Sequence, residues 1–201
     1  MKKGLILGRF QPLHMGHLSI FETVIDNDEE LVICVGSSNK KRTEKNPYTS
    51  FERMQMIKSV LSNYSCNYEI FEIPDINNND LYVNHLENIV SPFDKVYTGN
   101  KLVKELFENA GYPVIVPHLI NREAWQGVSI RQAMKDGGDW EMDVPASVAK
   151  IISDIKYNQE QQLAAGHHGV PLLVHGDQYF FGQDKFDEFL SFMHKNGMQR
   201  K

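Results

Sequence analysis

Short apolar runs alternate with amphipathic stretches over the first three quarters of the chain. The apolar runs predict strands near residues 3–7, 31–35, 68–73, 95–97 and 114–116. Apolar residues at helical spacing predict helices near 16–25, 50–61, 81–89, 101–110, 130–135 and 145–157. Because strands that alternate with helices form βαβ units, the pattern predicts an α/β fold with a parallel, Rossmann-like sheet.

Polar residues mark the starts of two of these helices. Thr49 precedes the helix predicted over 50–61, and Glu52 lies three residues after it, which is the spacing of a capping box. Asn100 lies where its side chain can cap the helix predicted over 101–110.

The composition is that of an ordinary globular protein. The 201 residues suit one α/β domain with a small appended segment, and 41% of them are hydrophobic and 23% charged. A net charge of −5 argues against a general nucleic-acid-binding protein, which would carry a basic face. Any site for an anion must therefore be local.

Neither a secretory signal nor a membrane-spanning segment is expected. The chain runs directly into the first predicted strand, and apolar residues never continue for 18 positions. We therefore expect a cytoplasmic protein without a membrane partner. Cys34 and Cys66 have no CxxC spacing and Cys34 lies in an apolar strand, so both are interpreted as reduced structural thiols.

One segment, with the sequence GRFQPLHMGH, stands where the first strand meets the first helix. The start of a helix leaves backbone N–H groups unpaired and favours negative charge, which suits it to phosphate. Gly8 and Gly16 allow close approach of a ligand, and Arg9 offers several donors. His14 and His17 can reach into the same anionic site.

The segment GRFQPLHMGH resembles the signature of the nucleotidylyltransferase superfamily, in which His-x-Gly-His holds the triphosphate of a nucleotide. In its full length, it is similar to the motif of nicotinamide-mononucleotide (NMN) adenylyltransferases of the archaeal type. The resemblance covers residues 1–157, which are expected to form one domain of this HIGH-type superfamily. Residues 158–201 are expected to form a small C-terminal extension of a hairpin and a helix.

The resemblance implies a set of catalytic residues that hold the triphosphate, namely His14, His17, Arg9, Arg131 and Lys45. It also implies substrate contacts within the same motif, from Gly8, Phe10, Gln11 and Gly16. A second triphosphate signature ends at Arg131, and Val128 stands there in place of the family's threonine. Ser129 is the candidate replacement for that hydroxyl. Lys45 replaces an arginine and loses the bidentate fork.

Other substrate-binding positions follow the predicted strands. The resemblance assigns this role to Gly36, Ser37, Asn79, Tyr82, Gly99 and Asn100. It implies that Asn79 reads the nicotinamide carboxamide. It implies that Tyr82 stacks on the ring, where the family more often has tryptophan.

Several charged residues near these positions have less specific interpretations. Lys40 and Lys41 are interpreted as solvated loop residues. Glu52 and Arg53 either form part of the nucleotide wall or make a surface pair. Asp75 and Asp80 are expected to orient their neighbours and not to act as a general base, because a phosphate nucleophile is already ionised at neutral pH.

The implied reaction is adenylyl transfer in NAD biosynthesis. The 5′-phosphate of NMN attacks the α-phosphorus of ATP in line, giving NAD and pyrophosphate without a covalent enzyme intermediate. Mg²⁺ arrives with ATP and keeps several waters, so no dedicated protein metal site is expected. The resemblance alone implies a homo-oligomer.

Two alternative functions stay open. One is a nucleotidylyltransferase with another acceptor, FMN or pantetheine phosphate, which the segment of Asn79 and Tyr82 disfavours. The other is a nucleotide-binding regulator without catalysis, which the departures at Val128 and Lys45 permit.

The chain after residue 157 carries a different pattern. A polar connector over 158–169 precedes a predicted hairpin around Gly176-Asp177. The helix predicted after it has an apolar face of Phe186, Phe189, Leu190 and Met193. Residues 166–197 resemble the closing segment of thioredoxin-fold oxidoreductases, but without a CxxC pair no activity is inferred. His167 and His168 are adjacent and are not expected to bind metal.

Overall fold

The computed structural model describes residues 2–27, 29–76, 78–117, 125–164, 172–175, 178–181 and 186–195. The chain divides into two compact units, Met1–Ile151 and Ile152–Lys201.

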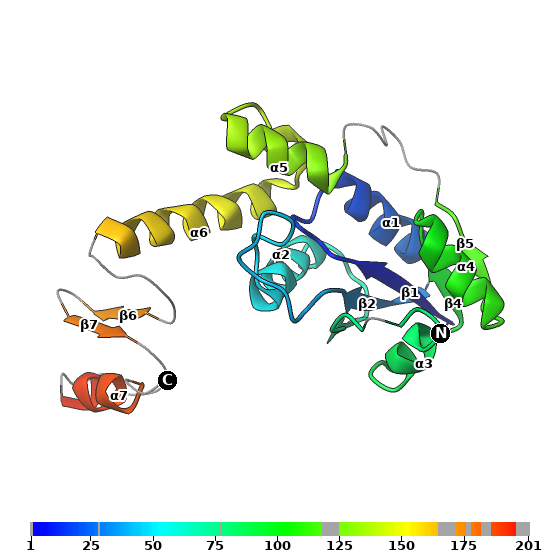
Figure 1. Cartoon of the computed structure of the whole chain (residues 1–201), viewed down its shortest axis with the longest axis horizontal. Coiled ribbons are helices and arrows are strands. Elements are labelled where there is room, and N and C mark those ends of the chain that lie inside the picture. Colours follow the sequence, from blue (N-terminus) through cyan, green and yellow to red (C-terminus); the bar gives the residue numbers. More distant parts are fainter. Residues whose placement is uncertain are drawn as a thin grey trace. The chain divides into compact units, whose positions relative to one another are not determined.

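The first unit is built on a five-stranded parallel sheet (Figure 1). Its strands are β1 (Lys2–Gly8), β2 (Glu29–Val35), β3 (Tyr68–Glu72), β4 (Lys95–Tyr97) and β5 (Val114–Ile115). They lie in the order β3-β2-β1-β4-β5, so the chain moves outward from β1 to β3 and returns to β4 on the other side of β1. This creates a topological switch point between β1 and β4. Ligands of open α/β sheets bind beyond the carboxyl ends of the strands at such a point.

Helices follow the strands as the sequence predicts. They are α1 (Met15–Asp26), α2 (Ser50–Leu61), α3 (Tyr82–Glu87), α4 (Lys101–Asn109), α5 (Gly127–Asp136), a 3-10 turn (Glu141–Asp143) and α6 (Ala146–Ala164). Most ends lie within a residue or two of the prediction, whereas α5 begins at Gly127 rather than near residue 130. Within the described residues, no helix is long and apolar enough to cross a membrane.

The helix α6 is longer than predicted. It continues to Ala164, so the prediction of a connector from residue 158 is wrong for the first part of that segment. The segment is rich in glutamine, glutamate, leucine and alanine, which favour helix, and Lys156 pairs with Glu160 one turn on at 4.0 Å. The rest of the connector, with His167 and His168, lies outside the described residues.

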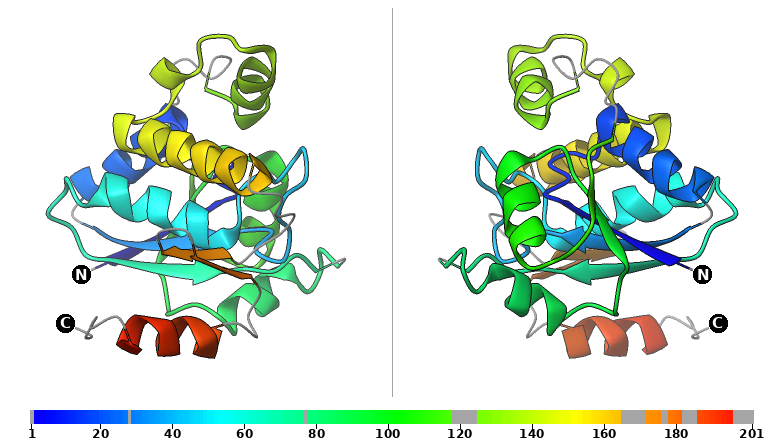
Figure 2. Two further views of the ribbon diagram at one scale, coloured as in Figure 1. Left: turned by 90° about the vertical axis from the view of Figure 1, so that its left-hand side faces the viewer. Right: turned by 90° about the vertical axis from the view of Figure 1, so that its right-hand side faces the viewer.

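Helices cover both faces of the sheet (Figure 2). On one face, α3 and α4 share an apolar cluster with the strands, consisting of Leu5, Val32, Cys34, Ile73, Val83, Leu86, Val96 and Phe107. On the other face, α1 packs so closely that a Cβ at Gly4 would lie 2.9 Å from Val24. Cys34 is fully buried, and burial raises the pKa of its thiol, as expected of an inert structural cysteine.

Both predicted helix caps are confirmed. The Glu52 N–H donates to Thr49 Oγ1 at 3.2 Å, and the Thr49 N–H donates to Glu52 Oε2 at 2.8 Å, which completes the capping box. The Val103 N–H donates to Asn100 Oδ1 at 3.2 Å. These hydrogen bonds fix the first residues of α2 and α4.

The described part of the second unit contains β6 (Leu172–His175), β7 (Gln178–Phe181) and α7 (Phe186–Lys195). The two strands pair antiparallel, with His175 opposite Gln178. The predicted hairpin and helix are therefore confirmed, while the Gly176-Asp177 turn lies outside the described residues.

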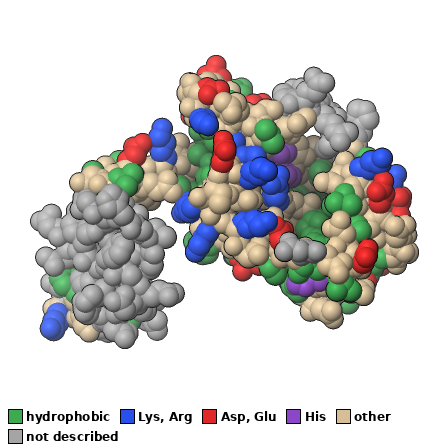
Figure 3. All heavy atoms as spheres, viewed as in Figure 1, with side chains coloured by type: hydrophobic (Ala, Val, Ile, Leu, Met, Phe, Trp, Pro, Cys, Tyr) green, Lys and Arg blue, Asp and Glu red, His purple; other side chains and the backbone are tan. Residues whose placement is uncertain are grey.

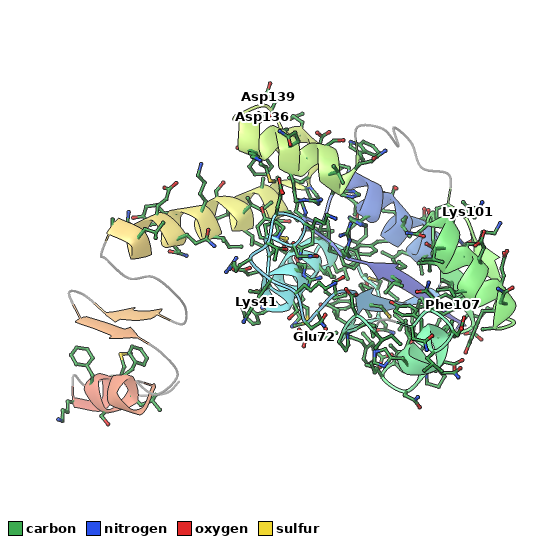
Figure 4. All side chains as sticks on the ribbon, viewed as in Figure 1. Lys41, Glu72, Lys101, Phe107, Asp136 and Asp139 are labelled. Carbon is green, nitrogen blue, oxygen red and sulfur yellow. The ribbon has the colours of Figure 1, made fainter. Side chains whose placement is uncertain are left out.

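The packing of α4 on the sheet can be tested at Phe107. This side chain is fully buried and points from α4 into the interior (Figure 4), edge-on to Phe93 and Tyr112 at centroid distances of 6.1 and 5.8 Å. In urea denaturation, Phe107→Ala should lower the free energy of unfolding by about 3–5 kcal/mol. The control Leu102→Ala, at an exposed position of α4, should cost less than about 1 kcal/mol. Equal losses in the two variants would contradict this packing.

Candidate active site

The loop after β1 is shaped by Phe10. This residue has a φ of 49°, and its ring is fully buried against His17 and Phe21 at centroid distances of 4.7 and 6.0 Å. A Cβ at Gly8 would lie 2.9 Å from the same ring. A glycine is therefore required at position 8 because the Phe10 ring packs against it. This reason adds to the close approach of a ligand inferred from the sequence.

Gln11 joins this loop to two other segments. Its side-chain amide donates to the Tyr48 carbonyl at 2.8 Å and accepts from the Tyr48 N–H at 2.9 Å. Its own carbonyl accepts a hydrogen bond from Arg131 Nη1 at 2.7 Å. Phe10 and Gln11, predicted as substrate contacts, have buried side chains that hold the site in shape.

His14 and His17 meet at the start of α1. Their rings stack with 3.7 Å between centroids and 25° between planes. The His14 N–H donates to His17 Nδ1 at 3.3 Å, so a neutral His17 ring carries its proton on Nε2. A Cβ at Gly16 would lie 3.1 Å from His14 Nδ1, so a glycine at this position leaves room for the His14 ring.

Both imidazoles are neutral in the ligand-free protein at pH 7. Burial, with a smaller contribution from the charge of Arg131, lowers the pKa of His14 to about 4. Burial also lowers the pKa of His17 well below 6.5, and His14 adds to this effect. The pair consequently offers neutral N–H donors rather than two positive charges.

A cavity of about 420 Å³ lies at the switch point between β1 and β4. Its wall includes Gly8, His14, Gly16, His17, Gly99, Asn100 and Trp125. All of these except Trp125 are predicted site residues. Trp125 was not predicted. Its position two residues before the second triphosphate signature is a signal in the sequence, since a flat indole suits stacking on a base.

A second cavity, of about 710 Å³, gathers the predicted cations. Its wall includes Arg9, Lys45, Tyr48, Val128, Arg131 and Lys135. Figure 3 shows Lys and Arg side chains gathered beside a hollow in the first unit, with a histidine visible at its edge. Lys135 was not predicted, but it lies one helical turn after Arg131 and therefore on the same face of α5.

The two cavities adjoin along two segments of the chain. Gly8 lines the smaller cavity and Arg9 the larger, and Gly127 lines the smaller and Val128 the larger. The two cavities therefore lie beside the same two segments of the chain, the loop after β1 and the start of α5.

Arg9 and Arg131 crowd each other in the larger cavity. Burial lowers the pKa of Arg131, and the neighbouring charge of Arg9 lowers it further. A Cβ at Gly127 would lie 3.1 Å from Arg131 Nη1, so the start of α5 is fitted closely around this guanidinium. Two like charges held together favour an anionic ligand, because its binding relieves their repulsion.

The two residues before Ile130 in α5 are both exposed. Val128 is 63% exposed and lines the larger cavity, while Ser129 is exposed outside the lining of both cavities. The structure thus brings Val128, and not the predicted replacement hydroxyl of Ser129, to the cation-rich wall.

The remaining predicted contacts follow β2 and β3. The Gly36 N–H donates to the Gly8 carbonyl at 2.9 Å, which joins the ends of β1 and β2.

Asn79 is exposed, and its carbonyl accepts from the Tyr82 N–H at 3.1 Å. Tyr82 is partly buried and packs against the apolar cluster. Burial raises the pKa of its phenol to about 12, and electrostatic interactions with Cys34 and Asp75 add to this effect. Asn79 and Tyr82 lie outside the lining of both cavities.

Asp75 gathers polar groups from the loop after β2. Ser37, which has a φ of 50°, donates from Oγ to Asp75 Oδ1 at 2.9 Å. Lys40 Nζ pairs with Asp75 Oδ2 at 2.6 Å. Lys40 is an exposed loop residue, as the sequence indicates, and its side chain pairs with Asp75, which orients its neighbours as expected.

Arg53 is a further site residue, and its burial excludes a surface pair with Glu52. Its side chain is 0% exposed. Nη1 donates to the carbonyls of Arg9 and Gly36 at 2.8 and 2.7 Å, and Nη2 donates to the carbonyl of Ser37 at 3.2 Å. The sequence carries a signal for this burial. Arg53 lies at helical spacing from Met56, Ile57 and Val60, which are buried on the same face of α2.

The fold and the two adjoining cavities define a nucleotide-binding α/β protein of the nucleotidylyltransferase class. Residues 5–133 match the family described as cytidylyltransferase-like. The chain is 42% identical over 154 residues to a nicotinamide-nucleotide adenylyltransferase of Picrophilus torridus, covering 76% of this chain and 91% of that protein. It is 40% identical over 160 residues to the enzyme of the same name from Pyrococcus furiosus, covering 78% and 85% of the two chains. The chain therefore belongs to the cytidylyltransferase-like family and, within it, to the nicotinamide-nucleotide adenylyltransferases.

A solved structure has the same fold. It is a bifunctional NMN adenylyltransferase/ADP ribose pyrophosphatase from Francisella tularensis, described as complexed with AMP and a manganese ion. The TM-score is 0.57 at 17% identity, with 89% of this chain covered. The present chain spans 62% of that longer one.

The low histidine pKa values predict how the ligand-free protein responds to acid. In an NMR titration of the imidazole nitrogens, His14 should stay neutral down to about pH 4, and His17 should also titrate far below pH 6.5. Unfolded histidines bind protons near pH 6.5, so the unfolded state binds more protons than the folded state below that value. Stability should therefore fall as the pH falls from about 6.5 toward 4. Titration of both rings near pH 6.5 in the folded protein would contradict their burial.

Proposed function

We propose that this protein transfers the adenylyl group of ATP to nicotinamide mononucleotide, giving NAD and pyrophosphate. The observation that carries the proposal is the junction between the cavities, where two neutral histidines adjoin a wall of cations. The curated relatives support it, because they are named nicotinamide-nucleotide adenylyltransferases and match most of both chains at about 40% identity.

ATP fits the two cavities as an elongated ligand. The smaller cavity, with Gly99, Asn100 and Trp125, suits the adenosine. The larger cavity suits the β- and γ-phosphates, since Arg9, Arg131 and Lys45 line it. The α-phosphate then lies at the junction, beside His14 and His17.

The transfer needs no nucleophile from the protein. A 5′-phosphate oxygen of NMN attacks the α-phosphorus, and the bond from that phosphorus to the bridging oxygen of the departing pyrophosphate breaks. Imidazole N–H groups of His14 and His17 donate to phosphate oxygens as charge shifts, and Arg9 and Arg131 neutralise the charge on pyrophosphate. Because both histidines are neutral, they act as donors that need not lose a proton.

Mg²⁺ enters the proposal as part of the substrate, bound to ATP. Among the described residues, no group of three or more His, Cys, Asp or Glu side chains could hold a metal ion. The polyphosphate itself offers the oxygen ligands that Mg²⁺ prefers. The proposal also includes a homo-oligomer, which rests on the family resemblance alone, and the cytoplasmic location expected from the sequence.

The acceptor end of the site is proposed at the exits of β2 and β3. Asn79 and Tyr82 follow β3, and Ser37 follows β2. With adenosine over β1 and β4, these neighbouring strand ends are the ones left for a second nucleotide.

The proposal can be tested by measuring NAD and pyrophosphate formation from ATP, Mg²⁺ and NMN. His17→Ala should lower kcat by about 10²–10³-fold, because a donor to the reacting phosphate is lost. Lys58→Ala, at an exposed position of α2, should leave kcat unchanged. FMN and pantetheine phosphate serve as rival acceptors, and turnover on either in place of NMN would refute the proposed acceptor. Tight ATP binding without turnover on any acceptor would instead favour a nucleotide-binding regulator.

Val128 offers a test by gain of function. Its exposed side chain lines the larger cavity, so a hydroxyl at this position can donate to a phosphate oxygen. Val128→Thr should lower the KM for ATP by about threefold to tenfold, since hydrogen bonds to charged groups are among the strong ones. Val128→Ala adds no hydroxyl and should not lower KM. Equal KM values for the threonine and alanine variants would show that this wall does not contact the phosphates.

A further inference from the structure

A tight turn over residues 43–46 contributes to the wall of the larger cavity. The Thr43 N–H donates to the Asn46 carbonyl at 3.1 Å, and the Asn46 N–H donates to the Thr43 carbonyl at 3.0 Å. These two hydrogen bonds leave Glu44 and Lys45 at the tip of the turn, and both residues line the larger cavity. The turn thereby brings a carboxylate into the wall that holds the predicted cations.

The base of this turn is fixed to α2. Arg42 Nη2 and Nη1 donate to the two carboxylate oxygens of Glu52 at 2.6 and 3.0 Å, and Nη1 also donates to the Pro47 carbonyl at 3.0 Å. Such a two-pronged pair fixes geometry as well as charge. The turn therefore has a support of its own, independent of any contact that its tip makes.

Lys135 meets the tip of the turn from α5. Its Nζ lies 3.4 Å from Glu44 Oε1, and it lines the larger cavity together with Glu44. The two side chains are 67% and 84% exposed, so their pairing is screened by solvent and contributes little to folding stability. A more highly charged anion in the cavity can consequently take the place of Glu44 beside the Lys135 ammonium.

The position of Lys135 along α5 defines which part of a ligand it meets. Gly127, at the start of the helix, lines the smaller cavity, while Arg131 and Lys135 line the larger one. A rise of about 1.5 Å per residue places Lys135 roughly 6 Å beyond Arg131 along the helix. Arg131 Nη1 donates to the Gln11 carbonyl in the loop after β1, whereas Lys135 reaches the turn of Glu44. Lys135 is thus the later of the two cations along the path away from the histidines.

We propose that Lys135 is a substrate-binding residue that holds the terminal phosphate of ATP. The inference rests on the proposed function, which places the α-phosphate beside the histidines and the β- and γ-phosphates in the larger cavity. The Lys135 ammonium donates to the γ-phosphate in place of Glu44, and Glu44 turns to solvent. A nucleoside diphosphate ends one phosphate earlier and leaves the pair of Lys135 and Glu44 intact. Lys135 therefore distinguishes ATP from ADP.

Isothermal titration calorimetry with ATP and with ADP, in excess Mg²⁺ and without an acceptor, tests this assignment on the full chain. Lys135→Met keeps an unbranched side chain and removes the charge. The Kd for ATP should rise by about tenfold, because a hydrogen bond between charged groups is lost. The Kd for ADP should change by less than about twofold. The control Lys58→Met, at an exposed position of α2, should change neither value.

Glu44→Gln separates a contact with phosphate from a role in holding the turn. In our proposal the Glu44 carboxylate competes with the γ-phosphate for Lys135, so its neutralisation should lower the Kd for ATP by about twofold or more. Lys135→Met and Glu44→Gln then act in opposite directions. If the pair served only to hold Lys45 in place, both variants would weaken ATP binding.

Three results would overturn the inference. They are an unchanged Kd for ATP in Lys135→Met, an equal rise for ATP and ADP in that variant, and weaker ATP binding in Glu44→Gln. NAD formation by the unmodified protein is measured separately. Binding of ATP without turnover on NMN would refute the proposed function and leave the assignment of Lys135 to be judged by the calorimetry. Absence of ATP binding to the unmodified protein would refute both.

Discussion

The arrangement of this site depends on the buried guanidinium of Arg53. It donates to the carbonyls of Arg9, Gly36 and Ser37, which lie at the ends of β1 and β2. A fully buried charge is costly unless its donors are satisfied, so these loops have little freedom to rearrange around it. One side chain of α2 thereby fixes the backbone from which Arg9, in the wall of the larger cavity, and Ser37, which donates to Asp75, project.

The site contains two kinds of side chain that can donate hydrogen bonds to a phosphate, and their environments differ. His14 and His17 are buried and neutral, so they can lie stacked against each other without repulsion. The cations line the larger cavity, where the like charges of Arg9 and Arg131 repel each other. This division suits adenylyl transfer, in which most of the charge to be neutralised develops on the departing pyrophosphate rather than at the attacked phosphorus.

Much of the fold could be predicted from the sequence, because its elements are marked by local signals. The apolar runs, the capping box at Thr49 and the glycine-rich motif each act within a few residues. Long-range contacts could not be predicted in this way. Arginine is seldom fully buried, so the interior position of Arg53 follows only from the four carbonyls that converge on it, those of Arg9, Gly36, Ser37 and Thr49. The pairing of Lys40 with Asp75 likewise depends on two strands lying side by side.

In the proposed complex, ATP lies across both cavities, with its α-phosphate where they adjoin. A crystal structure of the protein with ATP and Mg²⁺ tests this most directly. We expect adenosine beside Gly99 and Trp125, an α-phosphate within hydrogen-bond distance of His17 Nε2, and β- and γ-phosphates on Arg9 and Arg131. Adenosine in the larger cavity, or a triphosphate that contacts neither arginine, would contradict it.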